Sequence, residues 1–227
     1  MKLSVLNAQT DAFASFLRQP EADLHLYKYD LLAHFRQVWL GSSEAFAERY
    51  AQSLASEVTR RWWSRTGYAP REAMRVLIAH HPDFAAEAFK DLFDESRELN
   101  GRLDRFVFYA DELLRIYRAA HPDDALSDHH QDWSIIALYL AGRYPDRYTL
   151  YPGFDLFNAY LTTLEAAPCV IDDLERFFKV MRTTHGFLLR NDRLADALES
   201  TGRPYDHLLL AHEFVYYVTG RWDERAP

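Results

Sequence analysis

The chain has 227 residues, of which 48% are hydrophobic, 15% aromatic and 26% charged, and its formal net charge is −8. This balance is typical of a packed globular protein and excludes a long disordered chain. The single cysteine excludes a disulfide framework, and the low glycine content, 8 residues, argues against the phosphate loops of nucleotide-binding α/β enzymes.

Apolar side chains recur at intervals of three and four residues along almost the whole chain, and convincing period-two alternation is missing. The pattern predicts an all-α fold, a multi-helix orthogonal bundle of roughly ten helices. In chain order, the first helices are expected at residues 8–18, 22–39 and 44–63, then from Pro70, from Pro82 and over residues 102–120. The last of these carries the strongest pattern, with Leu103, Phe106, Ala110 and Leu113 at helical spacing.

The polar segment 122–130 is a connector and the internal junction that the sequence indicates best. Further helices are expected at residues 131–143, 154–165, 171–190, 192–200 and 205–219, with one short extended segment at 148–151. We expect a single helical domain over residues 1–220. The charged residues 221–227 are then a linker toward a further C-terminal module.

A search for catalytic and metal-binding patterns finds none with the required spacing. His207 and His212 are five residues apart, which differs from the i, i+4 spacing of a zinc-binding HExxH helix. We therefore expect no bound cofactor or metal, and no catalysis by this chain alone. One enzymatic alternative stays open, because arginines precede histidines at the spacing found in HEPN-like RNases, although chance predicts a similar number of matches. These pairs are Arg75 with His80 and His81, and Arg115 with His121.

Residues 58–75 form a basic and aromatic segment in an acidic chain, with five arginines against the single acid Glu72. Arginines interleaved with tryptophans suit phosphate contact combined with base stacking. A second group recurs every three residues within 176–182 and so falls on one face of the helix expected there. The predicted nucleic-acid-binding residues are Arg60, Arg61, Trp62, Trp63, Arg65, Arg71, Arg75, Arg176, Lys179 and Arg182. The structural alternative is that the tryptophans pack in the core while the arginines pair with acids or face solvent.

Three segments resemble a known family: 101–114 (GRLDRFVFYADELL), 135–151 (IIALYLAGRYPDRYTLY) and 170–183 (VIDDLERFFKVMRT). They are similar to the helical N-terminal region that precedes the AAA+ motor of McrB-like restriction NTPases, over roughly residues 85–190. In that family this region recognises the target, often modified DNA, while the motor hydrolyses GTP and recruits a nuclease subunit. The resemblance implies plain or modified DNA and a C-terminal AAA+ module in cis as partners. It assigns no function to individual residues, because the matching motifs are aromatic packing signatures.

Together these observations predict a non-catalytic recognition domain of an McrB-like restriction or antiviral defence protein that binds DNA through the arginine- and tryptophan-rich face. The alternatives are a helical adaptor that binds a protein partner and a HEPN-like RNase. The chain contains no run of 18 apolar residues and no secretion signal, so we expect a cytoplasmic protein without a membrane span.

Overall fold

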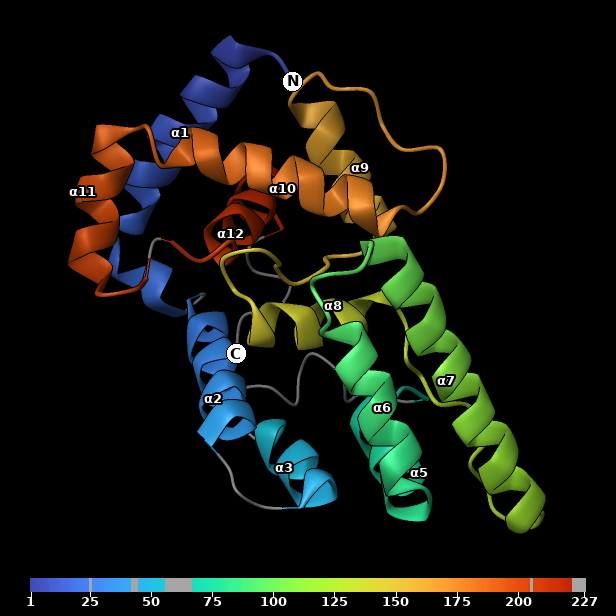
Figure 1. The fold of residues 1–227 in the computed structure, drawn as a ribbon. Helices are drawn as coiled ribbons and strands as arrows, with labels where there is room; N and C mark the ends of the chain where they lie inside the picture. Colours follow the sequence, from blue (N-terminus) through green and yellow to red (C-terminus); the bar gives the residue numbers. More distant parts are fainter. Residues whose placement is uncertain (25, 42–44, 56–66, 205, 222–227) are drawn as a thin grey trace. The chain divides into compact units, whose positions relative to one another are not determined.

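The computed structural model describes residues 1–24, 26–41, 45–55, 67–204 and 206–221. Within these residues every regular element is helical, with eleven α-helices and one 3-10 helix, so the predicted all-α fold is confirmed (Figure 1). The chain forms two compact units. The first comprises residues 1–30 and 144–227, and the second comprises residues 31–143. The junction predicted at 122–130 lies inside the second unit, and the single domain over residues 1–220 stays a prediction.

The first unit is arranged around the apolar helix α12 (Leu209–Val218). Residues 209–216 of this helix are all buried, which is expected of a helix that is apolar on nearly every side. The helix contacts α1, α9 and α10, and α1 also packs along α11 (Figure 1). The other elements of the unit are α1 (Leu3–Leu17), η1 (Pro20–Leu24), α9 (Phe154–Thr163), α10 (Leu174–Leu188) and α11 (Asp192–Thr201).

The second unit contains the remaining helices and an aromatic core. Its helices are α2 (Tyr27–Gly41), whose first turn belongs to the first unit, α3 (Phe46–Ser53), α5 (Pro70–His80), α6 (Pro82–Leu92), α7 (Leu99–Ala120) and α8 (Trp133–Arg143). Pro70 and Pro82 each occupy the first turn of a helix, where the missing N–H costs nothing, as predicted. Gly142 lies against Phe35 so closely that a Cβ would be 2.3 Å from the ring, which only glycine permits.

Two expected helix boundaries near the N-terminus are wrong. The first helix begins at Leu3 instead of residue 8, because the Lys2 N–H donates to the Leu164 carbonyl at 2.8 Å and Leu6 is buried. The expected helix 22–39 is divided into η1 and α2. The first difference arises from this tertiary hydrogen bond, which outweighs the local pattern.

The helix expected at 44–63 ends at Ser53, so Leu54 and Ala55 lie outside it. The Ala55 N–H donates to the Gln52 carbonyl at 3.1 Å, which tightens the chain and ends the α-helix. The remainder of that expected helix falls outside the described residues. Residues 148–151, expected to be extended, belong to no helix or strand. Every helix in the described part of the chain is too short or too polar to span a bilayer.

Candidate functional site

The basic segment predicted at residues 58–75 lies only partly within the described residues. Arg60, Arg61, Trp62, Trp63 and Arg65 fall outside them, so their contribution to a binding surface stays a prediction. The predicted residues that can be placed are Arg71 and Arg75 on α5, and the three cations of α10.

The two α5 arginines share one carboxylate. Arg71 Nη1 lies 2.7 Å from Glu72 Oε1, and Arg75 Nε lies 3.0 Å from Glu72 Oε2. Arg71 also donates to the Ala51 carbonyl at 3.0 Å, which holds its side chain against α3. Because Glu72 neutralises one of the two positive charges, Arg71, Arg75 and Glu72 together carry only one net positive charge.

The cations of α10 are arranged differently and form what we call the α10 face, defined by Arg176, Lys179 and Arg182. The guanidinium of Arg176 donates to the Ala167 carbonyl at 2.8 Å, and that of Arg182 donates to the Arg147 carbonyl at 3.3 Å. Among the described residues, none of the three forms an ion pair with a carboxylate. The α10 face therefore keeps three positive charges, two of them fixed in place by carbonyl groups.

The spacing of the α10 face suits a nucleic-acid backbone. With a rise of about 1.5 Å per residue, the cations extend about 9 Å along the helix axis. A DNA strand presents a phosphate about every 3.4 Å of rise, so two or three phosphates fall within this length. A guanidinium fork binds phosphate oxygens through two parallel hydrogen bonds, which a hydrated ammonium does not.

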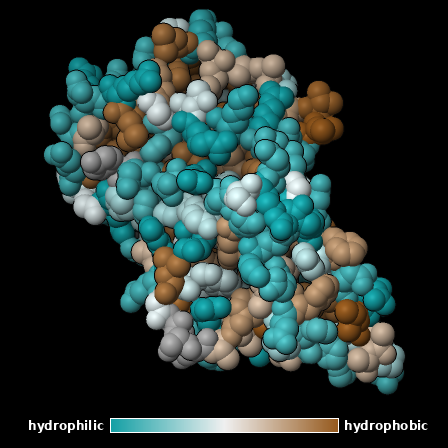
Figure 2. Space-filling view, in the orientation of Figure 1, coloured by the Kyte–Doolittle hydropathy of each residue, from teal (hydrophilic) through white to brown (hydrophobic). Residues whose placement is uncertain are grey.

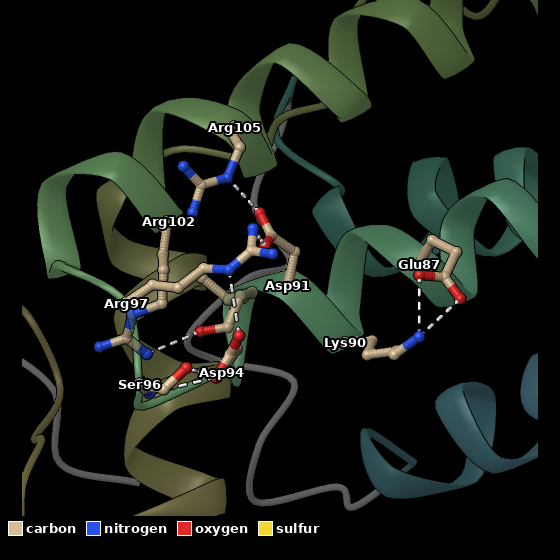
Figure 3. Close-up of polar contacts among 9 residues, drawn as sticks. Glu87, Lys90, Asp91, Asp94, Ser96, Arg97, Arg102 and Arg105 are labelled. Atoms are coloured by element: carbon tan, nitrogen blue, oxygen red, sulfur yellow. Dashed lines mark hydrogen bonds and ion pairs between the residues drawn. The ribbon is translucent and has the colours of Figure 1, made fainter.

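A second concentration of charge lies at the turn between α6 and α7, where Figure 3 shows acids and bases pointing toward one another. Asp91 accepts from both Arg97 and Arg105, and Arg97 also lies 3.1 Å from Asp94. The buried Arg102 donates to the Leu92 carbonyl at 2.8 Å, at the end of α6. The bond from Arg102 satisfies the last carbonyl group of α6, and the ion pairs join the turn to the start of α7.

This charged network lines a pocket of about 420 Å³, whose walls are Glu87, Lys90, Asp91, Asp94, Arg97 and Tyr109. Two hydrogen bonds from Ser96 hold the pKa of Asp94 below its usual range, and the positive charge of the nearby Arg97 lowers that pKa further. Lys90 and Glu87 pair with each other at 3.1 Å. Since the ionised groups of this pocket are already paired, we interpret it as a structural feature of the α6–α7 turn.

A third group combines aromatic and imidazole rings at the ends of α5 and α7. The ring centroids of His80 and His121 are 5.2 Å apart, and both rings contact Tyr117 at 5.4 and 4.6 Å. The Tyr117 hydroxyl donates to Asp124 at 2.9 Å, and this bond raises the pKa of Tyr117. The two imidazoles are exposed. The structure thus brings two exposed imidazole rings together at the ends of α5 and α7.

The sequence placed these two histidines in separate arginine–histidine pairs and missed their contact with each other. Arg75 is bonded to Glu72, and Arg115 is bonded to Glu112 at 2.9 Å, so both arginines hold a glutamate of their own helix. The contact between the two histidines could have been predicted from the sequence, because α5, α6 and α7 are linked by short segments and consecutive helices tend to run antiparallel. That arrangement places the C-termini of α5 and α7 at the same end.

Among the described residues, no three His, Cys, Asp or Glu side chains lie together as a metal site would require. Comparison with protein-family models, with curated proteins and with solved structures finds no match for the chain. The similarity of segments 101–114, 135–151 and 170–183 to McrB-like proteins therefore stays an expectation.

Proposed function

We propose that this protein binds nucleic acid through the α10 face, as a recognition module without catalytic activity of its own. The observation that carries the proposal is the set of three cations on one side of α10 that form no ion pair with a described carboxylate. A chain of net charge −8 is repelled by DNA at long range, so a local basic face has to supply the contact.

The sequence suggests further contact residues and a target for this binding. Arg60, Arg61 and Arg65, with Trp62 and Trp63, would supply further phosphate contacts and stacking surfaces. The resemblance to McrB-like proteins favours DNA, plain or modified, as the target, with an AAA+ motor acting in cis. Binding through the α10 face requires neither the residues at 60–65 nor the McrB-like resemblance, and it is tested separately.

Reversing the charge of the α10 face is expected to weaken DNA binding by at least about tenfold at low salt. The variant is Lys179→Glu with Arg182→Glu, measured by fluorescence anisotropy with a labelled DNA duplex and the matching single strand. For three phosphate contacts, log K should fall with log salt at a slope of about −2.7, or about 40-fold between 50 and 200 mM. The variant should show a shallower slope.

The control is Lys90→Glu with Arg193→Glu, which changes the net charge equally at two exposed cations that do not belong to the α10 face. It should retain most of the affinity. Equal losses in the control and the α10 variant would mean that only net charge matters, which contradicts the proposed face. Absence of binding by the unmodified protein at 50 mM salt would contradict nucleic-acid binding and leave the protein-adaptor alternative.

The contact between His80 and His121 favours a second candidate function, cleavage of RNA by acid–base catalysis. One imidazole would take the proton of a ribose 2′-hydroxyl, whose oxygen attacks the adjacent phosphorus. The other, protonated, would donate its proton to the departing 5′-oxygen. The products are a 2′,3′-cyclic phosphate and a 5′-hydroxyl, and no further reactant is needed.

For this second candidate, His80→Ala and His121→Ala should each reduce RNA cleavage by about 100-fold or more. His81→Ala, which removes the neighbouring exposed imidazole outside the ring cluster, should leave the rate unchanged. Cleavage is followed on a labelled single-stranded RNA with the purified full chain. Unmodified protein that leaves the RNA intact, or equal rates in all three variants, would contradict a catalytic role for this pair.

A further inference from the structure

Gly186 lies within α10 at a position where the fold does not call for glycine. Glycine weakens a helix relative to alanine, because its backbone loses more conformational freedom on folding. The φ angle of Gly186 is not in the left-handed region, and an added Cβ would meet no described atom within 4 Å. Gly142 is the opposite case, because the ring of Phe35 leaves no room for a side chain there. The space over Gly186 is therefore open to a ligand.

Gly186 belongs to the solvent-facing side of α10. The neighbouring side chains of His185 and Leu188 are buried, whereas Arg182 and Arg190 are exposed. These two arginines lie four residues before and four residues after Gly186, which places one of them a helical turn to each side of it. In Figure 1, α10 lies on the near side of the first unit, and the same view in Figure 2 is mostly hydrophilic.

The charge on this side of α10 extends beyond the three cations of the α10 face. The run from Arg176 to Arg190 contains four cations and no Asp or Glu, and Glu175 and Asp192 lie beyond its two ends. Arg190 forms no ion pair with a carboxylate that the structure describes. With a rise of about 1.5 Å per residue, the run extends about 21 Å, a length along which a DNA strand presents about six phosphates.

We propose that the nucleic-acid strand bound at the α10 face continues past Gly186 to Arg190, and that its sugar–phosphate backbone lies directly on the helix at Gly186. This inference rests on the proposed binding of nucleic acid by the α10 face. The missing side chain lets the strand approach closely enough for Arg182 and Arg190 to bind phosphates on either side of Gly186. Phosphate oxygens are common to every sequence, so this site takes nucleic-acid backbones of any sequence.

The first test adds a side chain at Gly186. Gly186→Ala should weaken binding of a labelled DNA duplex at 50 mM salt by about threefold, and Gly186→Leu by at least about tenfold, because the larger side chain moves the strand farther from the helix. Binding is measured by fluorescence anisotropy. The melting temperature of Gly186→Ala should rise by about 1–4 °C, since alanine stabilises a helix. A loss of affinity together with a gain of stability separates a binding role from a structural one.

The second test removes the fourth phosphate contact with Arg190→Gln. For four contacts, log K of the unmodified protein should fall with log salt at a slope of about −3.6, and the variant should show the slope of three contacts, about −2.7. The matched control is Arg193→Gln, an exposed arginine of α11, which should keep the slope of the unmodified protein. A slope that does not change in Arg190→Gln contradicts the proposed path of the strand.

The control for Gly186→Leu is Ala195→Leu, which adds a leucine side chain at an exposed position of α11 and should bind DNA as the unmodified protein does. Two duplexes of equal length and unrelated sequence should bind the unmodified protein within about twofold of each other. If the unmodified protein binds DNA and Gly186→Leu binds it equally well, the strand does not lie at Gly186, although the α10 face still binds nucleic acid. An unmodified protein that does not bind DNA contradicts both proposals.

Discussion

Replacing Glu213 with leucine is expected to lower the free energy of unfolding by about 3–5 kcal/mol. Glu213 on α12 and Lys28 in the first turn of α2 lie within the first unit, and both carboxylate oxygens are 2.8 Å from Lys28 Nζ. The side chains are 0% and 5% exposed. Without Glu213, the buried Lys28 ammonium loses the carboxylate to which it donates two hydrogen bonds of 2.8 Å. Chemical denaturation of the variant and the unmodified protein measures the loss.

The control for this prediction is the double variant Lys28→Met with Glu213→Leu. Replacing both members of a buried ion pair by apolar side chains of similar volume is often neutral or stabilising. A methionine would also keep contact with the rings of Tyr27 and Tyr216, which now lie 5.4 and 5.0 Å from the ammonium. The double variant should therefore recover most of the loss. A loss as large as that of the single variant would contradict the explanation by an uncompensated charge.

A pH series provides a second measurement of the same pair. Burial raises the pKa of Glu213, but the attraction of Lys28 and the contribution of His212 outweigh it and hold that pKa below the ordinary value of 4.5. A carboxyl group whose pKa is lower in the folded protein stabilises the fold above pH 4.5, and this contribution is lost as the pH falls through the folded value. The unmodified protein should thus lose more stability in acid than the double variant.

The sequence predicted those parts of the fold that depend on short-range patterns. Pro70 and Pro82 marked helix starts, and the three-residue spacing of Arg176, Lys179 and Arg182 placed them on one face of α10, because helical periodicity is a local property. The start of α1 was missed because it depends on a hydrogen bond from Lys2 to a residue far along the chain.

The parts of the candidate sites that escaped prediction depend on tertiary contacts. His80 and His121 meet only because two helices end at the same place. Lys28 and Glu213 are 185 residues apart, and a lysine within an amphipathic helix is ordinarily exposed. The helix expected from residue 171 begins only at Leu174, and Val170 and Ile171 before it are 94% and 71% exposed.

Replacing Phe89 with alanine is expected to lower the free energy of unfolding of the second unit by about 3–5 kcal/mol. Phe89 on α6 is 2% exposed, and its ring lies at the centre of the aromatic core. Rings from four other helices and the α6–α7 turn contact it, with centroid distances from 5.0 to 6.1 Å: Trp39, Phe46, Tyr50, Phe93, Phe106 and Tyr139. Truncation removes these contacts and leaves a cavity that the surrounding rings are too rigid to fill.

Phe108→Ala is the matched control for Phe89→Ala, because it deletes the same ring at a position that is 59% exposed. The control should change stability by no more than about 0.5 kcal/mol, since it removes little buried surface. Thermal and chemical unfolding of both variants, followed by near-UV circular dichroism, compares them directly, because that signal reports the packing of aromatic rings. Similar losses in both variants would mean that the aromatic core around Phe89 does not hold these helices together. A much larger loss in Phe89→Ala would locate the stability of this unit in the rings that α2, α3, α6, α7 and α8 bring to one point.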